Sequence, residues 1–183
     1  MTLLPKARDG LTRRGSGYLR WTMKTDELQQ ELSEPGAVEL LKSGPLVRLA
    51  YTGHDGYPRV IPIGFFWSGE EVIVCTTTVA PKVRAIAAHP HVAMTIDTGD
   101  TPATARSLLL RGTADVTTVD GVAEEYLAAA AKTLDPADLD GFEQEVRRVY
   151  KQMARIAIRP EWARYYDFGA GRLPKTLATV LAG

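Results

Sequence analysis

The stretch that decides the fold is DGYPRVIPIGFFW, residues 55–67, which joins a tight turn to a strong strand pattern. Asp55-Gly56 is typical of a β-hairpin turn, and residues 58–67 alternate with a period of two. One predicted face carries Arg59, Ile61, Ile63, Phe65 and Trp67, and the other carries Val60, Pro62, Gly64 and Phe66.

Pro62 and Gly64 interrupt this otherwise strong strand. Proline cannot donate a ladder hydrogen bond, and glycine weakens a strand interior. Two interpretations remain open at this point. The pair marks either a bulge or barrel corner, or a place where a flat ligand approaches the backbone.

The flanking segments predict short helices, antiparallel strands and two later helices. Strand patterns cover residues 46–51, 58–67, 71–78, 91–97, 107–116 and 154–159, the last ending at Pro160. Helical patterns cover residues 26–34, 37–42, 81–88, 120–132 and 136–152. This order indicates an α+β chain built on an antiparallel sheet or barrel.

A candidate anion site follows the third strand pattern. Thr76, Thr77 and Thr78 close the strand, and Pro81 suits the first position of a helix. The free N–H groups of a helix start favour an anion, whereas the dipole disfavours a cation such as Lys82 there. A bound phosphate would make the interaction of Lys82 with this position favourable. The alternative is a threonine-rich strand end with a solvated lysine.

Arg59 strengthens this interpretation because a hairpin joins strand 58–67 to strand 71–78. We therefore expect Arg59 to lie opposite the threonines and to reach the same anion. The alternative is a surface arginine on the polar face of a half-exposed strand.

Composition excludes several classes of function. The 183 residues include 22 Lys+Arg and 22 Asp+Glu, so no net field favours nucleic acid or an acidic membrane surface. We expect no membrane-spanning segment and no secretory signal, and hence a cytoplasmic protein. One cysteine, Cys75, and three histidines predict no disulfide and no metal site.

Three regions are expected along the chain. Residues 1–24 form a basic arm, residues 25–160 form the main domain with a helical insertion at 120–153, and residues 161–183 form an aromatic and glycine-rich tail. Within the tail, Trp162, Tyr165 and Tyr166 fall at a spacing that predicts one shared helical face. They are expected to pack across a dimer, or else to cap the barrel of their own chain.

The ordered set of residues 55–67, the threonine strand, Lys82 and His89-Pro90-His91-Val92 resembles the pyridoxamine-5′-phosphate-oxidase-like family. This family contains FMN-dependent and deazaflavin-dependent oxidoreductases. The resemblance covers residues 26–118 well and residues 119–183 loosely. It implies a six-stranded antiparallel split β-barrel with peripheral helices, working as a homodimer with cofactor sites at the subunit interface.

The resemblance also implies roles for particular residues. The cofactor edge would be lined by Arg59, Val60, Ile61 and Pro62. The phosphate and ribityl chain would meet Thr76, Thr77 and Thr78, with Lys82 as the main cation. The partner subunit would close the site with its 106–111 strand and the Trp162 region. Trp162 would stack on the cofactor ring of the other subunit.

The implied function is hydride or electron transfer between bound FMN, or a deazaflavin, and a small organic substrate. A carrier or sensor that binds flavin, deazaflavin or haem without turnover is the alternative, and a purely structural dimer is a third. The oxidase that gives the family its name ends in an R-L-x-P motif. Arg172-Leu173-Pro174 lies nine residues before the end here, which argues against oxidation of pyridoxamine phosphate.

Overall fold

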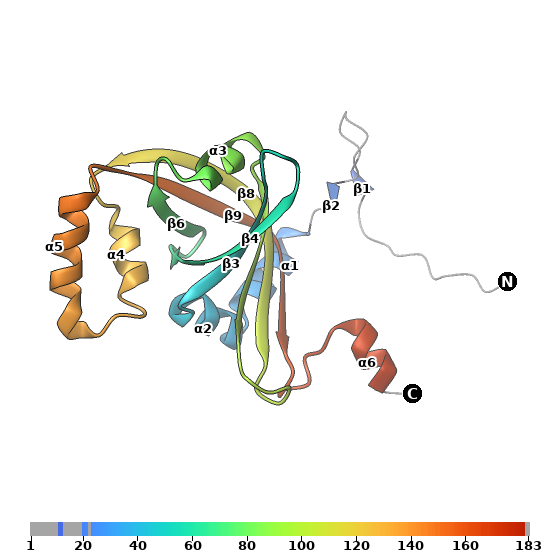
Figure 1. The fold of residues 1–183 in the computed structure, drawn as a ribbon. Coiled ribbons are helices and arrows are strands. Elements are labelled where there is room, and N and C mark those ends of the chain that lie inside the picture. Colours follow the sequence, from blue (N-terminus) through green and yellow to red (C-terminus); the bar gives the residue numbers. More distant parts are fainter. Residues whose placement is uncertain (1–10, 13–19, 22, 182–183) are drawn as a thin grey trace.

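The computed structural model describes residues 11–12, 20–21 and 23–181. Most of the predicted basic arm, residues 1–24, lies outside the described residues. Within it, strand β1 (Leu11–Thr12) pairs antiparallel with strand β2 (Arg20–Trp21). The remaining elements form one body around a single large sheet (Figure 1).

The large sheet is antiparallel and has seven strands in the order β4-β3-β7-β8-β9-β6-β5. Its strands are β3 (Leu46–Thr52), β4 (Pro58–Gly64), β5 (Phe66–Trp67), β6 (Val72–Thr77), β7 (His91–Thr98), β8 (Arg106–Asp120) and β9 (Gln152–Asp167). The α+β class is confirmed. The expected number of six strands is wrong, because residues 58–67 form two strands that Phe65 separates.

The sheet closes on itself through this break. β4 and β5 lie at opposite ends of the strand order, yet Phe65 alone lies between them in the chain. β5 pairs with β6 over two residue pairs, Phe66 with Ile73 and Trp67 with Val72. Beyond these pairs β4 hydrogen-bonds to β3 and β6 to β9, which leaves a seam between β4 and β6. The prediction that the whole of 58–67 lies beside 71–78 is therefore wrong.

Three helices close the barrel around its core. They are α1 (Thr25–Ser33), α2 (Pro35–Ser43) and α3 (Pro81–Ala88). The core includes Leu40 and Leu41 of α2, Ile86 of α3 and the inward residues of the strands. Phe65 is 0% exposed within it, so the chain turns into β5 around a buried aromatic ring.

A second apolar cluster lies on the outer side of β6, beneath the predicted insertion. The insertion forms α4 (Glu124–Ala130), a short 3-10 turn η1 (Pro136–Asp138) and α5 (Leu139–Val149). Figure 1 shows the two helices side by side at one end of the barrel. Their apolar residues pack on Ile73, Cys75 and Phe66. Glu143 and Arg147, four residues apart on α5, form an ion pair at 2.7 Å.

Strand β9 runs through Pro160 instead of ending there. The register between β8 and β9 shifts between Arg111 and Gly112, and Pro160 pairs with Gly112 at this bulge. Bulges tolerate proline because a ladder hydrogen bond is already missing. A Cβ atom on Gly112 would collide with the carbonyl oxygen of Arg159, so the bulge requires glycine.

The aromatic residues after Pro160 are consequently in a strand, and the predicted helical face is wrong. Trp162 is paired with Arg111 and Tyr166 with Ser107, and both lie on the outer face. Tyr165 points inward and is 4% exposed. The tail then turns at residues 168–174 into helix α6 (Lys175–Leu181), which stands away from the barrel in Figure 1.

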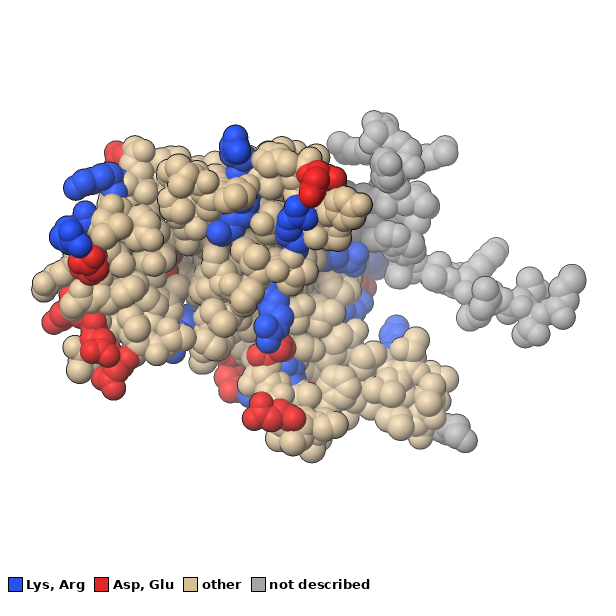
Figure 2. Space-filling model, viewed as in Figure 1, with Lys and Arg blue, Asp and Glu red and all other residues tan. Residues whose placement is uncertain are grey.

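The surface carries mixed charge. On the face seen in Figure 2, basic and acidic side chains are interspersed with broad uncharged areas. Among the described residues, no helix is long and apolar enough to cross a membrane. The same residues contain no group of three or more side chains arranged to hold a metal ion.

Candidate functional site

A cavity of about 200 Å³ lies at the seam between β4 and β6. Its floor combines Ile63 and Gly64 of β4 with Cys75 of β6, and α4 covers it with Tyr126 and Ala129. The rest of the lining consists of Pro45, Leu46, Ala130 and Thr133. The walls are mostly apolar and small, so the cavity suits one edge of a flat ring.

Gly64 and Cys75 give this cavity its shape. A Cβ atom on Gly64 would lie 3.7 Å from Cβ of Ala129, so a larger side chain would extend into the cavity. This placement favours the interpretation of Gly64 as a point of close ligand approach. Cys75 is buried within β6, and burial raises the pKa of its thiol to about 12. It is therefore a neutral, inert wall residue.

A polar corner adjoins the seam where β6 ends and α3 begins. Thr76, Thr77 and Thr78 are half-buried there, and helix α3 starts at Pro81 after Ala80, with no side chain capping its N–H groups. Within the described part of the chain, none of the three hydroxyls makes a side-chain hydrogen bond. Pro81 has no N–H group, and the Val83 N–H donates to the carbonyl oxygen of Ala80 at 2.9 Å. Among the described residues, the corner therefore offers the three hydroxyls and the backbone N–H of Lys82 without protein partners.

Lys82 is the cation of this corner. It lies in the first turn of α3, is half-buried and makes no ion pair with any described residue. Burial lowers the pKa of its ammonium group. A half-buried lysine at a helix N-terminus is disfavoured by both desolvation and the helix dipole. An anion bound at this point would offset both costs.

The structure places Arg59 elsewhere than expected. Arg59 pairs in register with Tyr51 of β3, not with the threonines. Its guanidinium donates to Asp55 at 2.7 Å within the hairpin. The role of Arg59 at a cofactor edge stays a prediction, and it requires this exposed ion pair to open.

The other predicted edge residues, Val60, Ile61 and Pro62, alternate along β4. Val60 and Pro62 face outward, with Val60 66% exposed, whereas Ile61 packs against the core. Pro62 lies two residues from Gly64 and shares its outer face. Their contact with a cofactor stays a prediction.

Trp162 lies on the same outer face but far along the sheet. A row of opposed residues crosses five strands, from Val60 through Ala50, Ala93 and Arg111 to Trp162. The Arg111 guanidinium stacks 4.1 Å from the centre of the Trp162 ring. Three strands separate Trp162 from β4 in this row, so its predicted stacking on a cofactor requires a second subunit.

Lys132 is a candidate residue of the functional site that the sequence did not indicate. It follows α4, donates to the carbonyl oxygen of Gly44 at 3.3 Å, and lies 3.8 Å from the centre of the Phe65 ring. Burial lowers the pKa of Lys132 to about 8. Lysine in an alanine-rich helical stretch is typical of a solvated face, so no sequence signal marks it.

Arg172 of the R-L-P sequence is a structural residue in this chain. Its guanidinium donates to the carbonyl oxygen of Tyr165 at 2.9 Å, to Glu34 at 2.6 Å and to Glu31 at 2.9 Å. These three contacts tie the tail to α1. They occupy the donors that an anionic substrate would need, which agrees with the sequence argument against oxidation of pyridoxamine phosphate.

Comparison with known proteins identifies the family. The antiparallel sheet closes into a barrel only through β5 and β6, and it stays unpaired at the seam between β4 and β6. This architecture is a split β-barrel. The family model described as pyridoxamine 5′-phosphate oxidase matches residues 33–163. The chain therefore belongs to this family, as the resemblance indicated. No curated protein matches the chain.

Solved structures agree with this assignment. An F420 reductase is 30% identical, with 68% of this chain and 93% of that chain covered and a TM-score of 0.52. A conserved hypothetical protein of Mycobacterium tuberculosis has a TM-score of 0.59 at 19% identity, covering 78% of this chain and 89% of that one. The haem storage protein HutZ of Vibrio cholerae has a TM-score of 0.51 at 16% identity, covering 70% and 90%. The last two likenesses concern the fold alone.

Proposed function

We propose that this protein is an oxidoreductase that binds a flavin-type cofactor, FMN or a deazaflavin, at the seam between β4 and β6. The observation that carries this proposal is the half-buried Lys82 ammonium, which has no partner in the described part of the chain. It lies beside a helix start without a side-chain cap and three threonine hydroxyls that no described residue engages. This donor set suits a phosphate group.

The neighbouring cavity suits the ring of the same molecule. It begins at Cys75, one residue before Thr76, and extends to Gly64, where no side chain shields the backbone. A cofactor whose phosphate lies at the polar corner would therefore direct its ring along the seam. The apolar lining would exclude water from one edge of that ring.

The chain supplies position and electrostatics in this proposal. Lys82 holds the negative phosphate through its ammonium group and its backbone N–H. The hydroxyls of residues 76–78 bind the polar chain between phosphate and ring. The bound flavin or deazaflavin supplies the hydride or electron chemistry. The apolar seam favours a small organic substrate that packs on the exposed face of the ring.

The proposed working unit is a homodimer. Val60, at the edge of the outer sheet face that runs to Trp162, is 66% exposed. A second copy seated on this face would bring its own Trp162 and its 106–111 strand toward the seam. The 30% identity with an F420 reductase supports the deazaflavin alternative as much as FMN.

Absorbance spectroscopy tests the proposal. The purified chain is incubated separately with FMN, with F420 and with haem, then freed of unbound ligand. We expect a flavin or deazaflavin spectrum at one cofactor per chain. Retention of haem alone would contradict the proposal and support the carrier alternative.

Turnover then separates an enzyme from a carrier. With the retained cofactor reduced by a nicotinamide or supplied as reduced F420, we expect reoxidation that accelerates when small quinone or enone acceptors are added. A rate equal to that of the free cofactor would leave binding without catalysis.

A further inference from the structure

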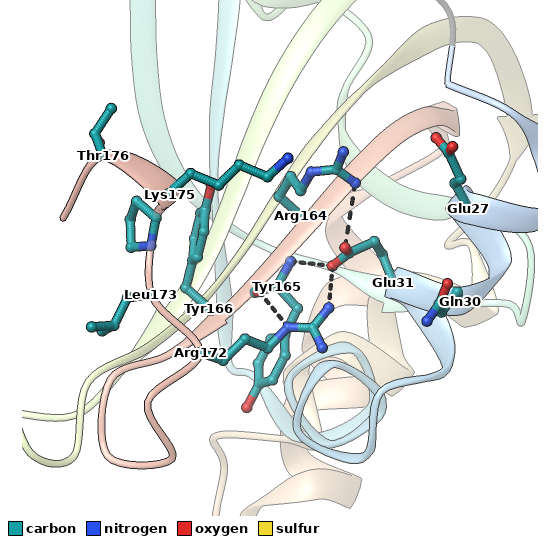
Figure 3. Close-up of a pocket in the computed structure, with 11 residues that line it drawn as sticks. Glu27, Gln30, Glu31, Arg164, Tyr165, Tyr166, Arg172, Leu173, Lys175 and Thr176 are labelled. Atoms are coloured by element: carbon teal, nitrogen blue, oxygen red, sulfur yellow. Dashed lines mark hydrogen bonds and ion pairs between the residues drawn. The ribbon is translucent and has the colours of Figure 1, made fainter. Parts of the chain in front are cut away.

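A second pocket of about 710 Å³ lies at the other end of the molecule, between α1, the last residues of β9 and the start of α6. Its charged lining residues are Glu27, Glu31, Arg164, Arg172 and Lys175 (Figure 3). In Figure 1, α6 and α3 lie at opposite ends of the barrel, so this pocket is separate from the polar corner at Lys82 within one chain.

The floor of the pocket is fixed by a saturated ion-pair network. Glu31 accepts from Arg172 at 2.9 Å, from Arg164 at 3.3 Å and from the backbone N–H of Tyr165 at 2.8 Å. Arg172 also binds Glu34, so its charge is matched by two carboxylates. This network holds the strand end, the tail and α1 in one arrangement before any ligand binds.

The network balances two arginines, Arg164 and Arg172, with two carboxylates, Glu31 and Glu34, and leaves Lys175 outside it. Arg164 shares Glu31 with Arg172, and its contact is the longest of the three. The Lys175 ammonium group makes no hydrogen bond or ion pair with any described residue. Glu27 lines the pocket but forms no ion pair within the same described part of the chain. In Figure 3 the Lys175 side chain extends toward Arg164, so two cations face each other with no carboxylate between them.

An apolar surface lies beside these cations. The ring of Tyr166 is half-buried and lies under the stem of Lys175 in Figure 3. Leu173 and Pro174 extend this side of the pocket. Such an arrangement combines one place for a negative group with one flat surface for a ring or short hydrocarbon.

We propose that this pocket binds a small organic anion, with its carboxylate or phosphate between Arg164 and Lys175 and its flat apolar part against Tyr166. An anion between these groups replaces the repulsion of two like charges by two charge-assisted hydrogen bonds. Glu27 and Gln30, on the α1 side, would accept from a hydroxyl or amino group of the ligand.

The test uses benzoate and phenyl phosphate as probes, with benzyl alcohol as the neutral analogue. Binding to the full chain is followed by isothermal titration or by chemical-shift changes. We expect saturable binding of at least one anion, no saturable binding of the alcohol, and an affinity that falls with added salt. Failure of both anions to saturate would overturn the proposal.

Variants assign the binding to this pocket. Lys175→Met should weaken the anion by about fivefold or more, and Lys175→Arg should restore it, because the change removes and then returns one charge-assisted contact. Lys151→Met, at an exposed lysine beyond α5, serves as the matched control and should bind as the wild type does. Equal affinity in Lys175→Met and wild type would overturn the assignment. The measurement needs no flavin, so its outcome is independent of the proposed function.

Discussion

Lys82 is the residue on which cofactor binding depends most directly. Its ammonium group is half-buried at the start of α3, without a partner among the described residues, and burial lowers its pKa. We predict that Lys82→Ala weakens FMN or deazaflavin binding by about 1.5–3 kcal/mol, the range for a charge-assisted hydrogen bond. Fluorescence quenching titration measures the change.

Lys42→Ala is the control for this variant, since Lys42 is an exposed lysine at the end of α2. It should bind the cofactor as the wild type does. A dissociation constant unchanged in Lys82→Ala would remove Lys82 from the site.

Lys132 predicts a pH dependence of stability. Burial lowers its pKa to about 8 in the folded chain, below the ordinary value of 10.5. The unfolded chain therefore binds more protons between these values, and stability rises with pH across this window. We predict that wild type gains stability relative to Lys132→Met between about pH 8 and 10.5.

Urea denaturation at pH 7.5 and pH 10 measures this difference for both proteins. All other titrating groups are common to both chains, so their contributions cancel in the difference between the two unfolding free energies. A difference in unfolding free energy that is constant with pH would show that Lys132 titrates normally.

At the scale of elements, we expect a substitution at the seam between β4 and β6 to change cofactor binding without lowering the stability of the fold. Gly64 lines the cavity, and its backbone does not adopt a positive φ angle. We predict that Gly64→Val keeps or slightly raises the free energy of unfolding, since valine favours strands. The same change should weaken cofactor binding about tenfold, because the added methyl groups occupy the cavity.

Gly64→Ala is the graded control, since its Cβ atom meets Ala129 at an ordinary contact distance of 3.7 Å. It should affect binding less than valine does. If Gly64→Val bound the cofactor as tightly as wild type, the ring would lie outside this cavity.

Most elements were predictable because alternation and helical periodicity report burial on one face. The strand that begins at Leu46 and the helix that begins at Pro81 follow such patterns closely. The break at Phe65 and the passage of β9 through Pro160 did not follow them. Both depend on the closure of the barrel and on the bulge opposite Gly112, which are tertiary features.

The candidate site was predictable in part. The threonines and Lys82 are adjacent in sequence, so their common corner follows from local structure. Arg59 was misplaced because the pairing of two strands was inferred from one hairpin, and only β5 pairs with β6. Lys132 and the α4 wall of the cavity come together through long-range packing that no local pattern contains.

At the scale of the whole molecule, we predict self-association through the outer sheet face, where Val60 is exposed. Phe65, Phe66 and Trp67 do not form an exposed apolar patch for a dimer, because Phe65 is fully buried and its two neighbours are partly buried. We therefore place the dimer contact on the outer sheet face from Val60 to Trp162. We predict a sedimentation mass of about twice 20.0 kDa at micromolar concentration.

Val60→Lys should shift this equilibrium toward the monomer, because it places a charge at an exposed apolar position of this face. Val180→Lys, at an exposed valine of α6, is the matched control and should sediment as the wild type does. A monomer of the unaltered chain would contradict the dimer and the predicted role of Trp162.

The most direct test of the central claim is a crystal structure of the chain with bound FMN or F420. We predict that the phosphate lies within hydrogen-bond distance of Lys82 Nζ and of the backbone N–H of Lys82. We predict that the ring lies along the seam against Gly64. A cofactor whose phosphate lay between Arg164 and Lys175, or anywhere else away from the β6–α3 corner, would contradict this claim.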